Sequence, residues 1–101
     1  MQTPLTAEVI LRIALLFTRE EREAASALLA SECGNNLPFC ANDTPAGLNR
    51  IRFAALKLSE GELGKLRKAI DLAKNDWRDL LVAARFADDV HAHEEWLPER
   101  R

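Results

Sequence analysis

The chain contains no tyrosine, only four glycines, four prolines and two cysteines, and few β-branched residues: valine, isoleucine and threonine together supply 11 of its 101 residues. The scarcity of residues that favour pleated strands argues against a sheet. Two cysteines are too few for a disulfide framework. Alanine and leucine, 16 of each, dominate instead, and both are strong helix formers. The composition predicts an all-α fold, a compact and partly orthogonal bundle of five or six short helices with no sheet.

Long apolar runs are also missing. The most apolar stretch, residues 9–17, has nine residues and is interrupted by Arg12, whereas a membrane-spanning helix needs about 20. No basic segment of the kind that begins a secretory signal precedes this stretch. These absences predict a soluble, cytoplasmic protein with no membrane partner.

Charge is nearly balanced, with a formal net charge of −2, but it is unevenly distributed. Residues 1–49 and 79–101 each carry six acids and three arginines, whereas residues 50–78 carry eight basic and four acidic residues. The overall balance disfavours a globally basic nucleic-acid binder. The middle segment is either an ordinary solvated helix face or a local surface for an anionic partner. The candidate residues of that surface are Arg50, Arg52, Lys57, Lys65, Arg67, Lys68, Lys74 and Arg78.

The basic middle segment, residues 50–78, also raises the question of nucleic-acid binding. Two predicted helices joined at residues 58–61 resemble a helix–turn–helix arrangement in outline. The second helix, however, begins with Glu60 and Glu62, where a recognition helix would meet phosphates and bases. Because the sign of the charge is wrong at that end, DNA binding through residues 50–78 is kept only as an alternative.

Capping residues mark where the first two helices begin. Thr6 is placed to cap a helix over residues 7–17. Thr18 and Glu21 have the spacing of a capping box, in which a hydroxyl and a carboxylate satisfy unpaired backbone donors, and they predict a second helix over residues 19–33.

Glycine, asparagine and proline mark the irregular segments. Gly34 is placed for a left-handed helix C-cap, and residues 34–43 form the one substantial loop. A third helix begins at Thr44–Pro45, since proline is tolerated at the first helical position. Residues 98–101 are expected to form a frayed tail. No linker divides the chain, so residues 1–101 form a single helical domain.

Residues 60–87 contain a regular apolar seam that begins after a second capping box, formed by Ser59 and Glu62. The seam predicts either one long helix or two helices, with a break or kink at Asp76, which is a good cap and a poor interior residue. We favour the break or kink. A short last helix over residues 90–96 follows.

The first helix is apolar on nearly every side, since its apolar residues cover the whole circumference at about 100° per residue and only Arg12 interrupts them. A surface helix would show one apolar stripe and a charged back. Either this helix is the central helix of the bundle, or its outer side meets a second copy in a homodimer. The candidate self-association surface comprises Val9, Ile10, Leu11, Ile13, Leu15, Leu16 and Phe17.

Few residues have the spacing that chemistry requires. Cys33 and Cys40 flank the loop and are either buried thiols or a disulfide. His91 and His93 point in different directions on a helix and cannot share one ion, although a tetrahedral site built with both cysteines is conceivable if that segment is not helical. No nucleophile arrangement or phosphate-binding loop occurs, so we expect no catalysis, no cofactor and no metal.

The two tryptophans are predicted to be structural. Trp77 belongs to the apolar seam and is expected in the core. Trp96 is expected to pin the C-terminal segment onto the bundle, with an exposed interface anchor as the alternative. Together these features favour a non-enzymatic interaction module that binds another protein and self-associates through its first helix. The alternatives are a nucleic-acid binder using residues 50–78, and a metal-binding or enzymatic protein using the Cys and His residues.

Overall fold

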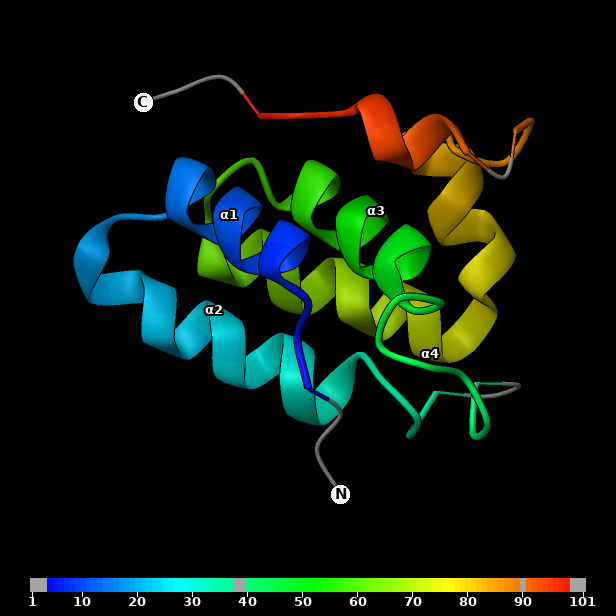
Figure 1. Cartoon of the computed structure of the whole chain (residues 1–101), viewed down its shortest axis with the longest axis horizontal. Helices are drawn as coiled ribbons and strands as arrows, with labels where there is room; N and C mark the ends of the chain where they lie inside the picture. The colour runs from blue at the N-terminus through cyan, green and yellow to red at the C-terminus, as the bar shows by residue number, and fades with distance from the viewer. Residues whose placement is uncertain (1–3, 38–39, 90, 99–101) are drawn as a thin grey trace.

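The computed structural model describes residues 4–37, 40–89 and 91–98. In order, the helices are α1 (Ala7–Leu16), α2 (Arg19–Glu32), α3 (Asn49–Ser59), α4 (Leu63–Ala84) and the short 3₁₀ helix η1 (Ala92–Glu95) (Figure 1). No strand occurs in these described ranges, and the all-α prediction is confirmed. The expected five or six helices were too many, because the seam forms one kinked helix and the last segment forms only a 3₁₀ turn.

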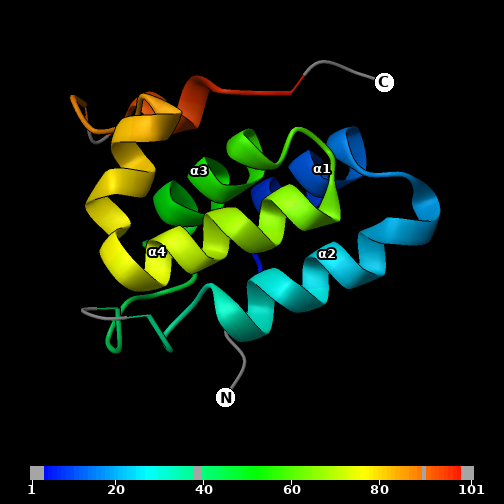
Figure 2. The ribbon, with the colours of Figure 1, turned by 180° about the vertical axis from the view of Figure 1, so that it is seen from behind.

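The central helix of the bundle is α3, not the apolar α1. Every side chain from residue 51 to residue 56 is buried, because α1, α4 and η1 all pack against α3. Figures 1 and 2 show α1 and α4 on opposite sides of the bundle, with α2 along its lower edge. The expectation that the first helix might be surrounded on all sides is therefore corrected.

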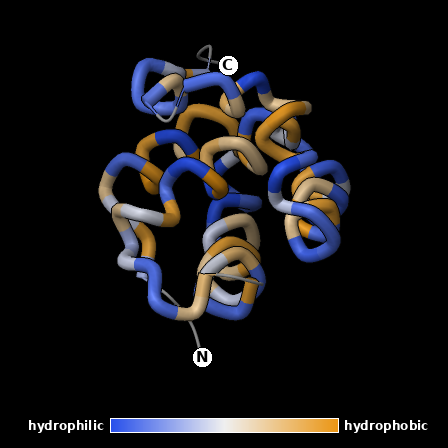
Figure 3. Tube along the Cα trace, turned by 90° about the vertical axis from the view of Figure 1, so that its right-hand side faces the viewer, coloured by the Kyte–Doolittle hydropathy of each residue, from blue (hydrophilic) through white to orange (hydrophobic). Residues whose placement is uncertain are grey.

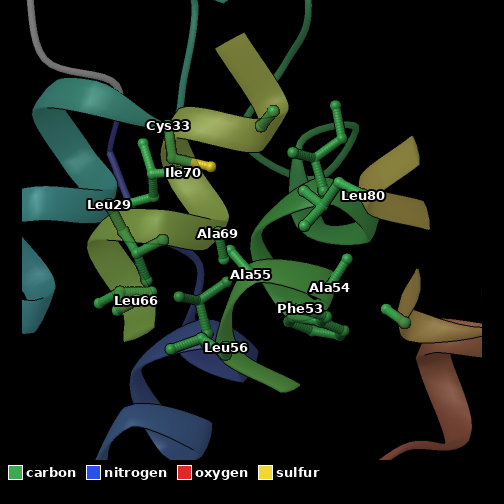
Figure 4. Packing of buried hydrophobic residues seen from close by; sticks show 14 of the residues in the cluster. Leu29, Cys33, Phe53, Ala54, Ala55, Leu56, Leu66, Ala69, Ile70 and Leu80 are labelled. Carbon is green, nitrogen blue, oxygen red and sulfur yellow. The ribbon is translucent and has the colours of Figure 1, made fainter. Parts of the chain in front are cut away.

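The core joins all four α-helices. Figure 4 shows Leu29 and Cys33 beside the side chains of Leu66 and Ile70 from α4, and all four belong to the same buried cluster as residues 53–56 of α3. Small side chains on α3 and α4 allow the two helices to pack closely. In Figure 3, hydrophobic and hydrophilic residues alternate around each helix, as expected for helices with one buried side.

α4 resolves the question of one helix or two. Its hydrogen-bonded pattern continues from Leu63 to Ala84, but Asp76 has a non-helical backbone (φ −156°, ψ 98°). The Asp76 carboxylate Oδ1 accepts a hydrogen bond from the Arg78 amide at 3.0 Å, which is the geometry of an N-cap. The predicted kink at Asp76 is confirmed, and Trp77 directly after it is half-buried against the core.

The predicted N-caps have mixed outcomes. Thr6 Oγ1 accepts from the Val9 amide at 3.3 Å, as predicted. The second capping box is wrong, because Ser59 is the last residue of α3; its hydroxyl donates to the Leu56 carbonyl and accepts from the Gly61 amide. Gly61 has a φ of 80°, which lets the chain reverse before α4 begins at Leu63.

The loop between α2 and α3 is longer than predicted. Thr44 Oγ1 accepts from the Gly47 amide at 3.0 Å, but this turn does not continue directly as regular helix, and α3 begins only at Asn49. Gly34 is not left-handed; its amide donates instead to the side chain of Asn36, which also caps the Glu32 carbonyl.

Candidate interaction surface

The outward side of α1 is an apolar strip in the described structure. The side chains of Ile10 and Leu11 are 54% and 49% exposed, and Leu15 is half-buried. Between them lie exposed Ala7 and half-buried Ala14. These five residues, which we call the α1 outer face, occupy neighbouring positions on the helix and include no charged side chain.

The opposite side of α1 faces the core. Val9, Ile13, Leu16 and Phe17 are buried in the chain's own core, so four of the seven candidate self-association residues are not available to a second copy. This narrows the expected surface to Ile10, Leu11 and Leu15. The reason is that α2 and α3 pack against α1 on the side of these four buried residues, while Ile10 and Leu11 on the other side stay exposed.

Arg12 lies on the buried side of α1 and is only 4% exposed. Its guanidinium donates from Nε to the Trp96 carbonyl at 3.1 Å, from Nη1 to the Glu8 carbonyl at 2.9 Å and from Nη2 to the Glu94 carbonyl at 3.4 Å. It also lies 3.9 Å from the centre of the Phe53 ring. Burial lowers the pKa of Arg12, but the carbonyl oxygens and the ring compensate the retained charge.

Sequence reasoning treated Arg12 as a polar interruption and missed this role. A usable signal was present, because position 12 shares one helix face with positions 9, 13 and 16, which are apolar. A charged residue within such a stripe requires partners inside the fold. Two of the three carbonyl partners of Arg12 come from a segment more than 80 residues away, which no local pattern shows.

An aromatic cluster holds the C-terminal segment beside Arg12. The ring of Trp96 lies 6.3 Å from the centres of both Phe53 and Phe86. The His93 ring lies 5.4 Å from Phe53 and 6.3 Å from Phe86. The prediction that Trp96 pins this segment onto the bundle is confirmed. Leu97, the next residue, is 55% exposed.

Three of the eight candidate basic residues serve the fold. Arg52 is fully buried and donates from Nε to the Cys33 carbonyl at 2.8 Å and from Nη1 to the Pro4 carbonyl at 2.7 Å, while burial lowers its pKa. Arg50 donates to the carbonyls of two residues that follow α4. Lys57 donates to the Ala84 carbonyl at 2.9 Å. The proposed anionic-partner surface therefore loses Arg52, and two more of its charges bind backbone oxygens.

The other five basic residues are exposed on α4. Lys65 contacts carboxylates of Glu60 and Glu62, both at 3.1 Å, and hydrogen bonds to these acids raise its pKa. Lys74 pairs with Glu32 at 3.3 Å. The remaining three are Arg67, Lys68 and Arg78, the last with its guanidinium 5.5 Å from the Trp77 ring. Glutamates thus neutralise Lys65 and Lys74. The five basic residues of α4 do not form one continuous positive patch.

The cysteines and histidines do not come together. Cys33 and Cys40 are buried and unbridged; burial raises the pKa of Cys33 to about 12 and that of Cys40 to about 11, so both stay protonated near neutral pH. His91 is exposed and pairs with Glu94 at 3.2 Å. Within the described residues, no group of three His, Cys, Asp or Glu side chains is arranged to hold a metal ion.

The comparisons with known proteins add no assignment. No protein-family model, curated protein or solved structure matches this chain. Over the part of the chain that the structure describes, none of the helices is sufficiently long and apolar to cross a bilayer.

Proposed function

We propose that this protein is a non-enzymatic, cytoplasmic interaction module that forms a homodimer through the α1 outer face. The observation that carries the proposal is the exposure of Ile10 and Leu11 at 54% and 49% within a strip that has no charged side chain. Contiguous exposed apolar patches on soluble proteins mark interaction sites. The unbridged, buried cysteines fit a reducing compartment.

The burial of these two exposed side chains supports only a weak dimer. Fully burying an isoleucine or leucine side chain is worth about 1.5–3 kcal/mol, so covering the exposed half of each contributes about 1 kcal/mol. In a two-fold dimer the Ile10 and Leu11 side chains of both copies contribute, for a total of about 4 kcal/mol. Association costs about 4–15 kcal/mol. These two residues alone therefore offset only the lower end of that cost, and the dimer needs further contacts around them.

Sedimentation equilibrium tests the proposal. We expect the wild-type chain to shift from monomer to dimer as its concentration rises from about 10 to about 500 µM, since a homodimer's population depends on concentration. Ile10→Asp places a carboxylate in the interface and should remain monomeric throughout. Val82→Asp is the matched control, because Val82 is 63% exposed and belongs to α4, which Figures 1 and 2 show on the opposite side of the bundle from α1. A wild-type chain that stays monomeric over this range contradicts the proposal.

A further inference from the structure

A pocket of about 200 Å³ lies where the loop before α3 meets α4. Its walls come from that loop, from the first turn of α3 and from the second half of α4. Figures 1 and 2 both show the loop at the end of the bundle where α4 bends. Since a cavity of about 150 Å³ holds benzene, this pocket has room for a ligand with one ring and a short polar head.

The inner part of the pocket is apolar. Cys40, Ile51 and Leu81 line it and are 4%, 7% and 3% exposed. Half-buried Trp77 adds an aromatic wall, and aromatic rings stack favourably on one another. These walls suit an aromatic ring better than a polar group, which would lose its hydrogen bonds to water there.

The rim of the pocket carries two opposite charges. Asp43 and Arg50 are the only charged residues among those that line it, since Arg78, whose guanidinium lies 5.5 Å from the Trp77 ring, does not line it. Neither Asp43 nor Arg50 belongs to an ion pair of the described structure. Both charges are therefore left for a ligand.

The two charged side chains are held in place by the fold. Arg50 Nη2 donates to the carbonyls of Phe86 and Ala87, while its buried Nε has no partner. The turn that carries Asp43 is closed by a hydrogen bond from its amide to the Cys40 carbonyl at 3.1 Å. Burial, and to a smaller extent the charge of Asp43 and its hydrogen bond with the thiol, raise the pKa of Cys40 to about 11, so the carboxylate reaches the pocket wall. Groups held this way need little ordering when a ligand binds.

We infer that this pocket binds a free α-amino acid with an aromatic side chain. The ring packs against Trp77 and the apolar wall, the carboxylate binds Arg50 and the ammonium binds Asp43. An α-amino acid carries its two opposite charges on one carbon atom, which matches a rim with one base and one acid. A ligand with a single charge would satisfy one rim residue and place a like charge or no charge beside the other. No wall of the pocket belongs to α1, so this inference is independent of the proposed dimer.

NMR titration of the isotope-labelled full chain with L-phenylalanine tests the inference. We expect saturable shifts at the Trp77 indole N–H and the Gly47 amide, with a Kd of about 1 mM or below. Phenylpropionate lacks the ammonium and phenethylamine lacks the carboxylate. Each of these analogues should bind at least about ten-fold more weakly, because it loses one charge-assisted hydrogen bond.

Variants of the rim assign each charge to its partner. Asp43→Asn should weaken phenylalanine at least about ten-fold and should not weaken phenylpropionate, and Arg50→Gln should weaken phenylalanine and not phenethylamine. A general loss of stability would affect both ligands of a pair equally. Asp71→Asn, on the exposed face of α4, is the matched control and should leave the phenylalanine Kd within about two-fold of wild type.

Three results would overturn the inference. The first is an absence of saturable binding of phenylalanine to the wild-type chain up to about 10 mM. The second is an effect of Asp43→Asn no larger than that of Asp71→Asn. The third is equal affinity for phenylalanine and its two analogues, which would show that the rim charges recognise neither charge of the amino acid.

Discussion

The contrast between α1 and α3 shows what decides which helix is buried. α1 is the more apolar in sequence, yet it lies at the surface with Ile10 and Leu11 exposed. α3 carries Arg50, Arg52 and Lys57, yet it is the central helix. The number of apolar residues therefore did not determine burial here. Instead, α3 provides cationic side chains that donate hydrogen bonds to backbone carbonyl oxygens, which would otherwise lack partners.

The acceptors of these cations lie where other helices end. Arg52 donates to the carbonyl of Cys33, the C-cap of α2, and Lys57 donates to the carbonyl of Ala84, the last residue of α4. The last carbonyls of a helix have no partner within it, and cationic side chains near a C-terminus interact favourably with its dipole. α3 thus tolerates its charges in the interior because they satisfy the ends of its neighbours.

The largest expected effect comes from removing the most deeply buried of these charges. Arg52→Met removes a charged donor from two carbonyls, and each hydrogen bond to a charged group contributes about 1.5–3 kcal/mol. We expect the free energy of unfolding to fall by about 3 kcal/mol or more, measured by urea denaturation. Arg67→Met, on the exposed face of α4, is the control and should change stability by less than about 0.5 kcal/mol. Equal losses in both variants would show that Arg52 is not a buried structural cation.

The two sides of α1 can be compared directly. Ile13 is 2% exposed and Ile10 is 54% exposed on the same helix. Ile13→Ala should destabilise the chain by about 2–5 kcal/mol, because it leaves a cavity in the core. Ile10→Ala, measured at a concentration where the chain is monomeric, should cost less than about 1 kcal/mol. A similar loss for both would mean that α1 is covered all round within one chain.

A smaller, pH-dependent effect probes the burial of the Cys33 thiol; the carbonyl of the same residue accepts a hydrogen bond from Arg52. Burial holds the pKa of Cys33 at about 12, above the ordinary value of 9.0, so the folded state favours the neutral thiol. Its contribution to stability is complete below about pH 9 and is lost as the pH rises through the folded pKa toward 12. The stability difference between wild type and Cys33→Ala should therefore shrink by about 2 kcal/mol between pH 8.5 and about 10.5. A difference that stays constant would place this thiol in contact with water.

Local sequence signals predicted the elements better than their placement. The Thr6 cap and the Asp76 kink depend on residues close in sequence, and both were confirmed. The Ser59 capping box was wrong because Gly61 takes a left-handed conformation and delays the start of α4. A serine followed three residues later by a glutamate is thus compatible with the start of a helix and, as Ser59 shows, with the end of one.

The candidate site was less predictable. The apolar circumference of the first helix predicts a self-association surface on α1, but periodicity could not show which side of this helix the rest of the chain would cover. That depends on Arg12, whose partners Trp96 and Glu94 lie at the other end of the sequence. The burial of Arg52 has the same origin, since its acceptors, the carbonyls of Pro4 and Cys33, belong to two separate segments.

The central claim is that the α1 outer face is covered by a second copy of the chain. Sedimentation equilibrium of the wild-type chain beside Leu11→Asp tests it most directly, because Leu11 is 49% exposed at the middle of that face. The account predicts that the apparent mass of the wild type rises from 11.3 kDa toward twice that value with concentration, while the variant stays at the monomer mass with an unchanged helical spectrum. A single monomer mass for both proteins, or the same dimer for both, would contradict it.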